Sequence, residues 1–255
     1  MEIFQIILLA IVQGITEFLP ISSQSHIILM SKLMEMDDQG LGFDIALHAG
    51  SLLAILIYYR RELNQALSFT DEGKSYIKLI IIGSIPLPIV ALIFMDFVSI
   101  HFRSINSIAY ITIIFAVLLY FSDMRKKDQY RNLKSIGIYI IIFIGFMQTL
   151  AIIPGVSRSG IVITAALLAN FSREDSIRIA FILSIPAIFM ATTYQSFQLY
   201  ELKNYNILTD HLIGVLISFL VSYITIHLFI TTINRISFTP YIVYRIILGF
   251  VLLGI

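Results

Sequence analysis

The apolar N-terminal segment is interrupted by the stretch Gln13-Gly-Ile-Thr-Glu17-Phe-Leu-Pro20-Ile-Ser22-Ser23-Gln-Ser25-His26, which contains a carboxylate, three serines and an imidazole. A second polar stretch, Pro154-Gly-Val-Ser157-Arg158-Ser159-Gly160, follows another apolar run. We name residues 13–26 the first polar segment and residues 154–160 the second polar segment. A charge at membrane depth costs about 2.5 to 3.5 kcal/mol on insertion scales, so it is usually paired or binds a polar substrate. One acidic and one basic segment, both rich in hydroxyls, therefore predict a single anion-binding site.

The composition is that of a membrane protein. The 255 residues are 58% hydrophobic and 13% charged, with a mean hydropathy of +0.90. A soluble domain carries about 25% charged residues. The absence of cysteine excludes disulfides and thiol chemistry. We expect an all-α, polytopic helical bundle that forms one integral-membrane domain over residues 1–255. Its surroundings are the bilayer, and we expect no nucleic-acid partner.

Apolar runs long enough to cross a bilayer, which takes about 20 residues, lie at about 41–59, 77–95, 105–122, 136–153, 177–197, 212–233 and 240–255. Two further stretches, 3–34 and 154–170, are too short or too interrupted to cross. We predict that these form broken or re-entrant helices, because non-helical backbone at membrane depth must be satisfied by protein or by a polar cavity. Both contain or follow the order Gln, apolar residues, Pro and two serines, which suggests an inverted repeat of the kind seen in transporters.

Loop charge predicts the orientation. The loops at 60–78 and 123–135 are rich in Lys and Arg, whereas the loop at 96–104 holds only Arg103. The positive-inside rule then places the first two loops in the cytoplasm and both polar segments in the outward-facing half of the membrane. The loop at 171–178 is the exception, since its side is not decided. If it is cytoplasmic, residues 161–170 cover only about 15 Å, and the second polar segment lies nearer the middle of the membrane.

Each polar segment precedes a helix-like run, at 24–33 and at 161–169. Free N–H groups and the positive end of the helix dipole make a helix start an anion site. Two such starts facing one cavity, with the planar guanidinium of Arg158 between them, would clamp a phosphate or a diphosphate. The hydroxyls of Ser22, Ser157 and Ser159 would cap the helices, donate to the anion or attack it.

The first polar segment also offers catalytic groups. Glu17 and Gln13 project from one helical face. A carboxylate beside a phosphate repels it unless a cation bridges the two, and Mg²⁺ commonly binds one or two carboxylates together with substrate phosphates. Glu17, with Gln13, is therefore a candidate metal ligand, or a base that activates water or serine. Ser23 and His26 fit a nucleophile and its base, or His26 protonates a leaving phosphate.

Structural explanations compete with these roles. Ser22 would serve only as a helix cap, Glu17 and Arg158 would form a structural ion pair, and His26 would bond a backbone carbonyl. We expect carbonyl bonds for His48 and His227 and snorkelling to the interface for Arg235 and Arg245. We expect Asp44 near the interface, with the alternative that Phe43-Asp44, next to His48, lines the cavity.

The two polar segments, with the intervening Phe43-Asp44-Ile-Ala-Leu-His48-Ala-Gly50-Ser51-Leu-Leu-Ala, resemble the motifs of the integral-membrane undecaprenyl-diphosphate phosphatases of bacteria, the bacitracin-resistance type. The resemblance is closest over about 1–62 and 145–190. It implies hydrolysis of a polyprenyl diphosphate to the monophosphate and inorganic phosphate, aided by a divalent cation such as Mg²⁺ or Ca²⁺. It further implies a multi-pass protein of the bacterial inner membrane whose active site faces outward and recycles the lipid carrier of peptidoglycan. Whether the chain forms a homodimer is not decided by the sequence.

Carried over to this chain, the resemblance gives Glu17 the place of the family's essential second acid. Ser23 and His26 take the places assigned to attack and proton transfer. Arg158 takes the place of the phosphate-binding arginine, with Ser157 and Ser159 on either side.

This chain departs from the family pattern at several positions. Gln13 stands where many members have Glu, so a two-carboxylate metal site is weakened. Gln24-Ser25 replaces the usual Thr-Gly or Thr-Ala before His26. Val162 stands where the motif ends in Thr, so either activity is reduced by the lost hydroxyl or Thr164 or Ser25 compensates for it.

A carrier or flippase for a lipid phosphate is the competing function. It would share the broken helices and the anion pocket and would use Arg158. The cluster of Glu17, Ser23 and His26 favours the enzyme, because transport does not require a nucleophile beside a base. The acid-phosphatase fold of other lipid phosphatases is disfavoured, because its Lys…Arg-Pro element is missing. A purely structural membrane protein leaves the two polar segments unexplained.

Overall fold

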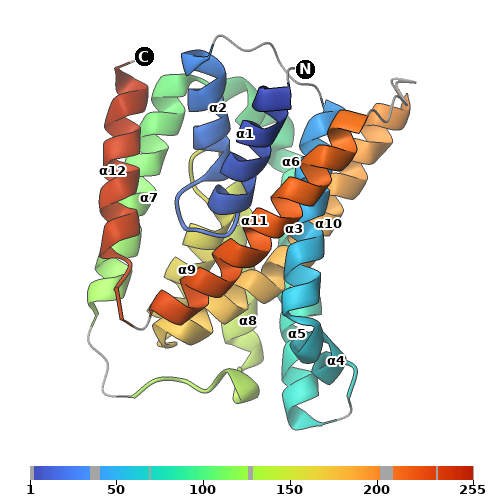
Figure 1. Cartoon of the computed structure of the whole chain (residues 1–255). Coiled ribbons are helices and arrows are strands. Elements are labelled where there is room, and N and C mark those ends of the chain that lie inside the picture. The colour runs from blue at the N-terminus through green and yellow to red at the C-terminus, as the bar shows by residue number, and fades with distance from the viewer. Residues whose placement is uncertain are drawn as a thin grey trace.

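A computed structural model describes residues 3–34, 41–68, 70–125, 129–201, 209–233 and 235–254. Within these ranges the chain forms helices and turns without a strand, so the predicted all-α class is confirmed. Helices satisfy every backbone polar group inside the segment itself, which is what a lipid solvent demands of an apolar chain. The helices stand roughly side by side, and α11 crosses the bundle obliquely in front of α3 (Figure 1).

The helices in chain order are α1 (Ile3–Thr16), α2 (Ser23–Leu33), α3 (Leu41–Tyr58), α4 (Arg60–Ala66), α5 (Asp71–Ser84), α6 (Pro86–His101), α7 (Ile105–Met124), η1 (Leu133–Ser135), α8 (Ile138–Thr149), η2 (Leu150–Ile152), α9 (Arg158–Leu168), α10 (Arg173–Glu201), α11 (Thr209–Ile233) and α12 (Thr239–Leu253).

By length and composition, 5 of the described helical segments can cross a membrane: Leu41–Tyr58, Gly73–His101, Ile105–Met124, Arg173–Tyr200 and Thr209–Ile233. Shorter apolar helices cover 3–16, 138–152, 158–168 and 239–253. The predicted crossing at 136–153 is wrong, because α8 has 12 residues and passes through η2 into the second polar segment. The predicted crossing at 240–255 corresponds to the 15 residues of α12.

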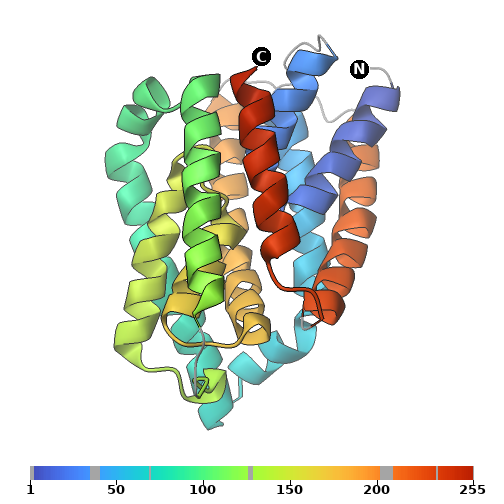
Figure 2. The ribbon, with the colours of Figure 1, turned by 90° about the vertical axis from the view of Figure 1, so that its left-hand side faces the viewer.

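Two helical hairpins dominate the architecture. The pair α1–α2 starts from one end of the bundle, and the pair α8–α9 starts from the opposite end (Figures 1 and 2). Their turns, at 17–22 and 153–157, meet about halfway between the two ends (Figure 1). Both hairpins fall in the regions predicted to hold broken or re-entrant helices, although the second one begins earlier, at Ile138.

The two hairpin turns are also alike in backbone conformation. Ser22 and Ser157 have φ angles of 70° and 68°, an unusual left-handed conformation for serine, and each directly precedes the second helix of its hairpin. Those second helices, α2 and α9, each have 11 residues. Gln13 and Gln148, at corresponding places in the first helices, are both fully buried. These correspondences and the opposite directions of the hairpins support the predicted inverted repeat.

The end of the bundle that carries the basic loops includes residues 171–178. The Arg131 amide donates to the Asn170 carbonyl at 2.9 Å. Arg173 donates to the two carboxylate oxygens of Asp123 at 2.6 and 3.0 Å, and the Phe238 amide donates to the same carboxylate at 3.2 Å. Residues 171–178 therefore lie at the same end of the bundle as the loop at 123–135. The second polar segment then lies at middle depth, as expected from the sequence if these two loops share one side of the membrane.

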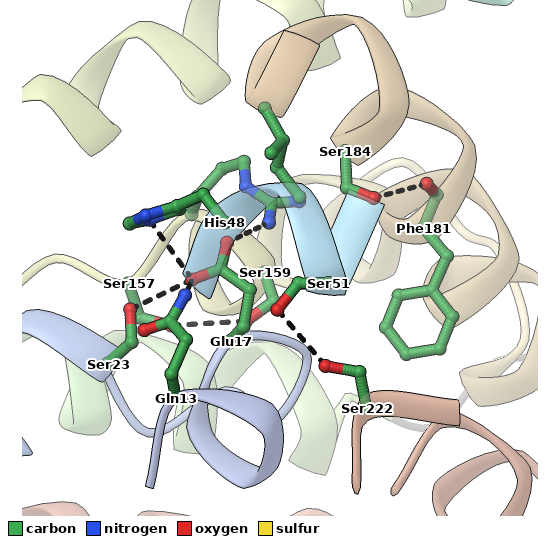
Figure 3. A network of polar contacts seen from close by, with 12 residues as sticks. Gln13, Glu17, Ser23, His48, Ser51, Ser157, Ser159, Phe181, Ser184 and Ser222 are labelled. Atoms are coloured by element: carbon green, nitrogen blue, oxygen red, sulfur yellow. Dashed lines mark hydrogen bonds and ion pairs between the residues drawn. The ribbon is translucent and has the colours of Figure 1, made fainter. Parts of the chain in front are cut away.

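The helices α3 and α11 pack closely against each other. A Cβ at Gly50 would lie 2.4 Å from the Val215 carbonyl oxygen, so only glycine permits this approach. Ser51 accepts from Ser222 at 3.0 Å (Figure 3). It also shares a 3.1 Å hydrogen bond with Ser218. Small residues and hydroxyl bonds of this kind hold helices together where lipid offers no hydrophobic driving force.

Candidate active site

Glu17 is the centre of the site. It follows the last turn of α1, and its amide still donates to the Gln13 carbonyl at 3.0 Å. Its carboxylate meets the guanidinium of Arg158, the first residue of α9, where Nη2 donates to Oε1 at 2.6 Å. The side chains are only 8% and 13% exposed. The structure therefore brings the acidic and the basic segment together, and Glu17 and Arg158 form the ion pair that was the structural alternative to a substrate site.

The second carboxylate oxygen of Glu17 gathers three further groups. Oε2 accepts from Gln13 Nε2 at 3.0 Å and from Ser23 Oγ at 3.1 Å, and His48 Nε2 lies 3.9 Å away (Figure 3). These side chains come from α1, α2 and α3. Hydrogen bonds from Arg158, Gln13 and Ser23 stabilise the charge of this buried carboxylate.

The second polar segment forms a capped helix start. The Ser157 hydroxyl accepts from the Gly160 amide at 3.2 Å and lies 3.2 Å from the Ser159 hydroxyl. Ser159 donates its hydroxyl hydrogen to the Leu19 carbonyl at 2.8 Å, which ties this segment to the first one. Because the Ser159 hydrogen is used in that bond, Ser157 must donate in the contact between the two serines.

Two polar atoms at the centre lack a protein partner in the described part of the chain. Arg158 Nη1 and Gln13 Oε1 are both buried without a hydrogen bond. Burying an unpaired polar atom costs about 1 to 3 kcal/mol, so such atoms require an explanation. A guanidinium N–H can donate to a phosphate oxygen, and an amide oxygen can accept from a phosphate hydroxyl or bind a cation. The site is thus prepared to bind an oxygen-rich anion.

His26 does not form the predicted pair with Ser23. Its Nδ1 lies 2.7 Å from the Ser22 carbonyl oxygen, and its Nε2 lies 2.6 Å from the hydroxyl of Tyr244 on α12. Among the described residues, Ser23 instead donates to Glu17. Both imidazole nitrogens are therefore occupied, and the carboxylate of Glu17 is the basic group that faces Ser23.

The hydroxyls expected to compensate for Val162 have other partners. Thr164 donates to the Gly160 carbonyl at 2.8 Å within α9, as a buried helical threonine commonly does. Ser25 is buried, donates to the Ser22 hydroxyl at 2.9 Å and lies 3.3 Å from the Thr112 hydroxyl. Ser25 thus supports the turn of the first hairpin, and Ser22 directs its hydroxyl there rather than toward Glu17.

Arg245 contradicts the prediction that it snorkels to the interface. Its side chain is fully buried, at 0% exposure. Its Nη2 donates to the carbonyl oxygens of Gly155 and Val156, each at 3.0 Å, and its Nη1 donates to that of Pro20 at 3.5 Å. A Cβ at Gly160 would lie 2.9 Å from Nη1, so a side chain there would require the guanidinium to shift. One guanidinium therefore holds the turns of both hairpins together.

Sequence reasoning missed three residues at this centre, namely His48, Tyr244 and Arg245. His48 bonds the Asp44 carbonyl at 2.8 Å, as expected, yet its other nitrogen faces Glu17. Its place in the motif between the polar segments was the available signal. Tyr244 and Arg245 lie in the C-terminal apolar run, and their sequence surroundings gave no such signal.

The oxygen atoms at the centre of the site decide whether a divalent cation would fit there. The described residues contain no group of three or more His, Cys, Asp or Glu side chains that could hold a metal. The oxygen donors at the centre are the Glu17 carboxylate and the unpartnered Gln13 Oε1. One carboxylate and one amide fit a hard cation that takes its other ligands from substrate phosphates and water, as Mg²⁺ does.

Fold and site together define a multi-pass helical membrane protein with a buried, ion-paired centre suited to phosphate. The chain belongs to the family described as Bacitracin resistance protein BacA, whose profile matches residues 6–251. It is 41% identical over 257 residues to the undecaprenyl-diphosphatase of Saccharophagus degradans, covering 98% of this chain and 96% of the relative. It is also 41% identical over 264 residues to the undecaprenyl-diphosphatase of Thioalkalivibrio sulfidiphilus, covering 99% and 98%. Undecaprenyl-diphosphatase 1 of Pseudoalteromonas translucida is 39% identical over 266 residues, covering 98% and 97%.

Proposed function

We propose that this chain is an undecaprenyl-diphosphatase, which hydrolyses a polyprenyl diphosphate to the monophosphate and inorganic phosphate and so recycles the lipid carrier of the bacterial cell wall. The observation that carries the proposal is the buried carboxylate of Glu17, bound at once by Arg158 and by the hydroxyl of Ser23. This arrangement combines an anion-binding cation, a nucleophile and a base in one place. The relatives named above support the choice of substrate.

In this proposal Arg158 binds the phosphate through its Nη1 group, which has no hydrogen-bond partner among the described residues. The start of α9, with its free N–H groups and dipole, adds to the attraction. Ser23 Oγ attacks the terminal phosphorus and passes its proton to Glu17, while the P–O bond to the lipid monophosphate breaks. Water then hydrolyses the phosphoserine and releases inorganic phosphate. In the alternative mechanism, water attacks the phosphorus directly in place of Ser23 and gives its proton to the same carboxylate.

A divalent cation is part of the proposal. Glu17 and Gln13 are the residues that would hold it, together with oxygens of the substrate. When bound, the cation would neutralise charge on the diphosphate and thereby lower its repulsion with Glu17. We further propose that the basic end of the bundle lies in the cytoplasm and that the site opens toward the outer face of the plasma membrane.

A lipid-phosphate carrier or flippase is the second candidate. The observation in its favour is that two opposed hairpins meet at middle depth, as in transporters with inverted repeats (Figure 1). The two functions differ in whether inorganic phosphate is released. An enzyme releases inorganic phosphate in detergent solution, where no second membrane face exists, whereas a carrier leaves the diphosphate intact.

The test is a phosphate-release assay on the purified protein in detergent, with a polyprenyl diphosphate as substrate, in the presence and absence of a divalent metal. We expect release by the wild type and none above background by Arg158→Ala or Glu17→Ala. The matched control is Arg103→Ala, which removes an exposed arginine at the turn between α6 and α7 and should leave turnover unchanged. Absence of release by the wild type would overturn the proposed function, and full turnover by both site variants would overturn the assigned site.

A further inference from the structure

Tyr244 contacts the first polar segment from the far end of the chain. Its hydroxyl lies 2.6 Å from His26 Nε2, and the two residues are 218 positions apart. The two rings are nearly parallel, at an interplanar angle of 5° with centroids 5.4 Å apart. The hydroxyl is therefore held within hydrogen-bond distance of the imidazole nitrogen.

The direction of these hydrogen bonds follows from chemistry. A carbonyl oxygen can only accept, so the 2.7 Å contact with the Ser22 carbonyl requires a hydrogen on His26 Nδ1. The neutral imidazole then has a lone pair on Nε2, and the Tyr244 hydroxyl must donate to it. Tyr244 thereby selects the tautomer that bonds the Ser22 carbonyl.

The Ser22 carbonyl belongs to the peptide that joins Ser22 to Ser23. In a trans peptide the C=O and the following N–H point in opposite directions. Fixing the carbonyl toward His26 thus directs the Ser23 N–H away from His26. It also fixes the backbone from which Ser23 Oγ reaches Glu17 at 3.1 Å. The Ser22 backbone has a positive φ of 70°, a strained conformation for serine that needs support from its surroundings.

We propose that Tyr244 is a positioning residue for the diphosphatase reaction, acting through His26 on the Ser22–Ser23 peptide. The inference rests on the proposed function. It gives His26 the task of holding the Ser22 carbonyl with Nδ1–H, with Tyr244 keeping that hydrogen in place, and it leaves Glu17 as the base toward Ser23. The importance of His26 then does not depend on its removing a proton from Ser23.

The experiment is a double-mutant cycle measured by phosphate release, with kcat and KM determined separately. Tyr244→Phe keeps the ring and removes the hydroxyl. We expect kcat to fall about tenfold, equal to about 1.4 kcal/mol, while KM stays within about twofold of the wild-type value. His26→Ala should lower kcat further. In the His26→Ala background, Tyr244→Phe should have no additional effect, because the hydroxyl has lost the group through which it acts.

Tyr241→Phe is the matched control. Tyr241 lies one turn earlier on α12 and packs edge-on against Phe229 at 5.1 Å, away from His26. We expect its kcat to equal that of the wild type. Thermal denaturation in detergent should give Tyr244→Phe and Tyr241→Phe similar midpoints, because neither change removes apolar packing.

Three results would overturn the inference. They are an unchanged kcat in Tyr244→Phe, an equal loss from Tyr244→Phe with and without His26, and a loss that follows only the thermal midpoint, as a purely structural contact would give. A wild-type protein that releases no phosphate would instead overturn the proposed function, so the two failures can be told apart.

Discussion

Replacing Glu17 by Gln removes a buried charge while the shape of the side chain stays the same. The amide oxygen of the new residue can still accept from Arg158 Nη2, which donates to Glu17 Oε1 at 2.6 Å. Removing one member of a buried ion pair costs about 3 to 5 kcal/mol. Because one hydrogen bond survives, we expect a smaller loss of about 2 kcal/mol, the worth of the charge in a charge-assisted bond.

The other half of the new amide presents an NH₂ group where Oε2 accepted from Gln13 and Ser23. Gln13 can turn its amide over, because its own Oε1 has no partner to lose. Ser23 can rotate its hydroxyl so that the oxygen accepts. The protein therefore folds, but Ser23 no longer faces a base. General base catalysis is worth about 10² to 10⁴ in rate, so we expect Glu17→Gln to lower kcat about 10³-fold.

The assay is single-turnover phosphate release by purified protein in detergent, with the thermal midpoint measured on the same samples. The matched control is Glu174→Gln, since the ion pair of Glu174 with Arg178 is more than a third exposed and contributes little. Its kcat should stay within about twofold of wild type. The reasoning is refuted if Glu17→Gln keeps kcat within about tenfold of wild type, or if its loss of activity is explained by loss of folded protein.

Arg245→Met keeps the length of the side chain but removes its bonds to the carbonyls of both hairpin turns. We expect a loss of about 3 kcal/mol in stability, seen as a lower thermal midpoint together with loss of phosphate release. A variant as stable as wild type would contradict the role of Arg245 in holding the two hairpin turns together. Asp123→Asn weakens the bidentate bond to Arg173 at the basic end of the bundle, where Arg173 is 37% exposed. We expect about 1 to 2 kcal/mol of destabilisation with unchanged kcat per folded molecule, and a large fall in kcat would argue against a purely structural role.

The sequence predicted the centre of the site because charge is easy to recognise in an apolar chain. Glu17 and Arg158 each lie in a segment that is otherwise lipid-like, and a pairing of the two avoids two separate desolvation costs. The same argument predicted broken helices around them, because Pro and Gly at membrane depth need a protein or polar environment. The buried ion pair at the meeting point of the two hairpins agrees with the first expectation, and the turns at 17–22 and 153–157 are consistent with the second.

The orientation of α12 could not be predicted. Arg245 shares one helical face with Ile242, Leu248 and Leu252, all of them buried. In a soluble protein this spacing would mark the inner face. In a membrane helix the lipid-facing residues are equally apolar, so periodicity does not distinguish inside from outside. Because the inner face of this helix could not be recognised, Arg245 was expected to snorkel to the interface.

The pairing of His26 and the extent of the second hairpin also depended on distant parts of the chain. Ser23 and His26 have the spacing of neighbours on a helix, but the imidazole is captured by Tyr244 from α12. The apolar run at 136–153 has the length of a crossing helix, yet α8 ends where the second polar segment must reach Glu17. In both cases a tertiary contact outweighs the local pattern.

The distance in sequence between Glu17 and Arg158 has a consequence for biosynthesis. The two residues are 141 positions apart, and a ribosome adds about 5 to 20 residues per second, so the carboxylate waits roughly 7 to 28 s for its counter-ion. During that time the N-terminal hairpin carries an uncompensated charge that lipid does not solvate. We therefore expect the nascent hairpin to remain in water or beside the insertion machinery, and to settle in the bilayer only when the second hairpin arrives.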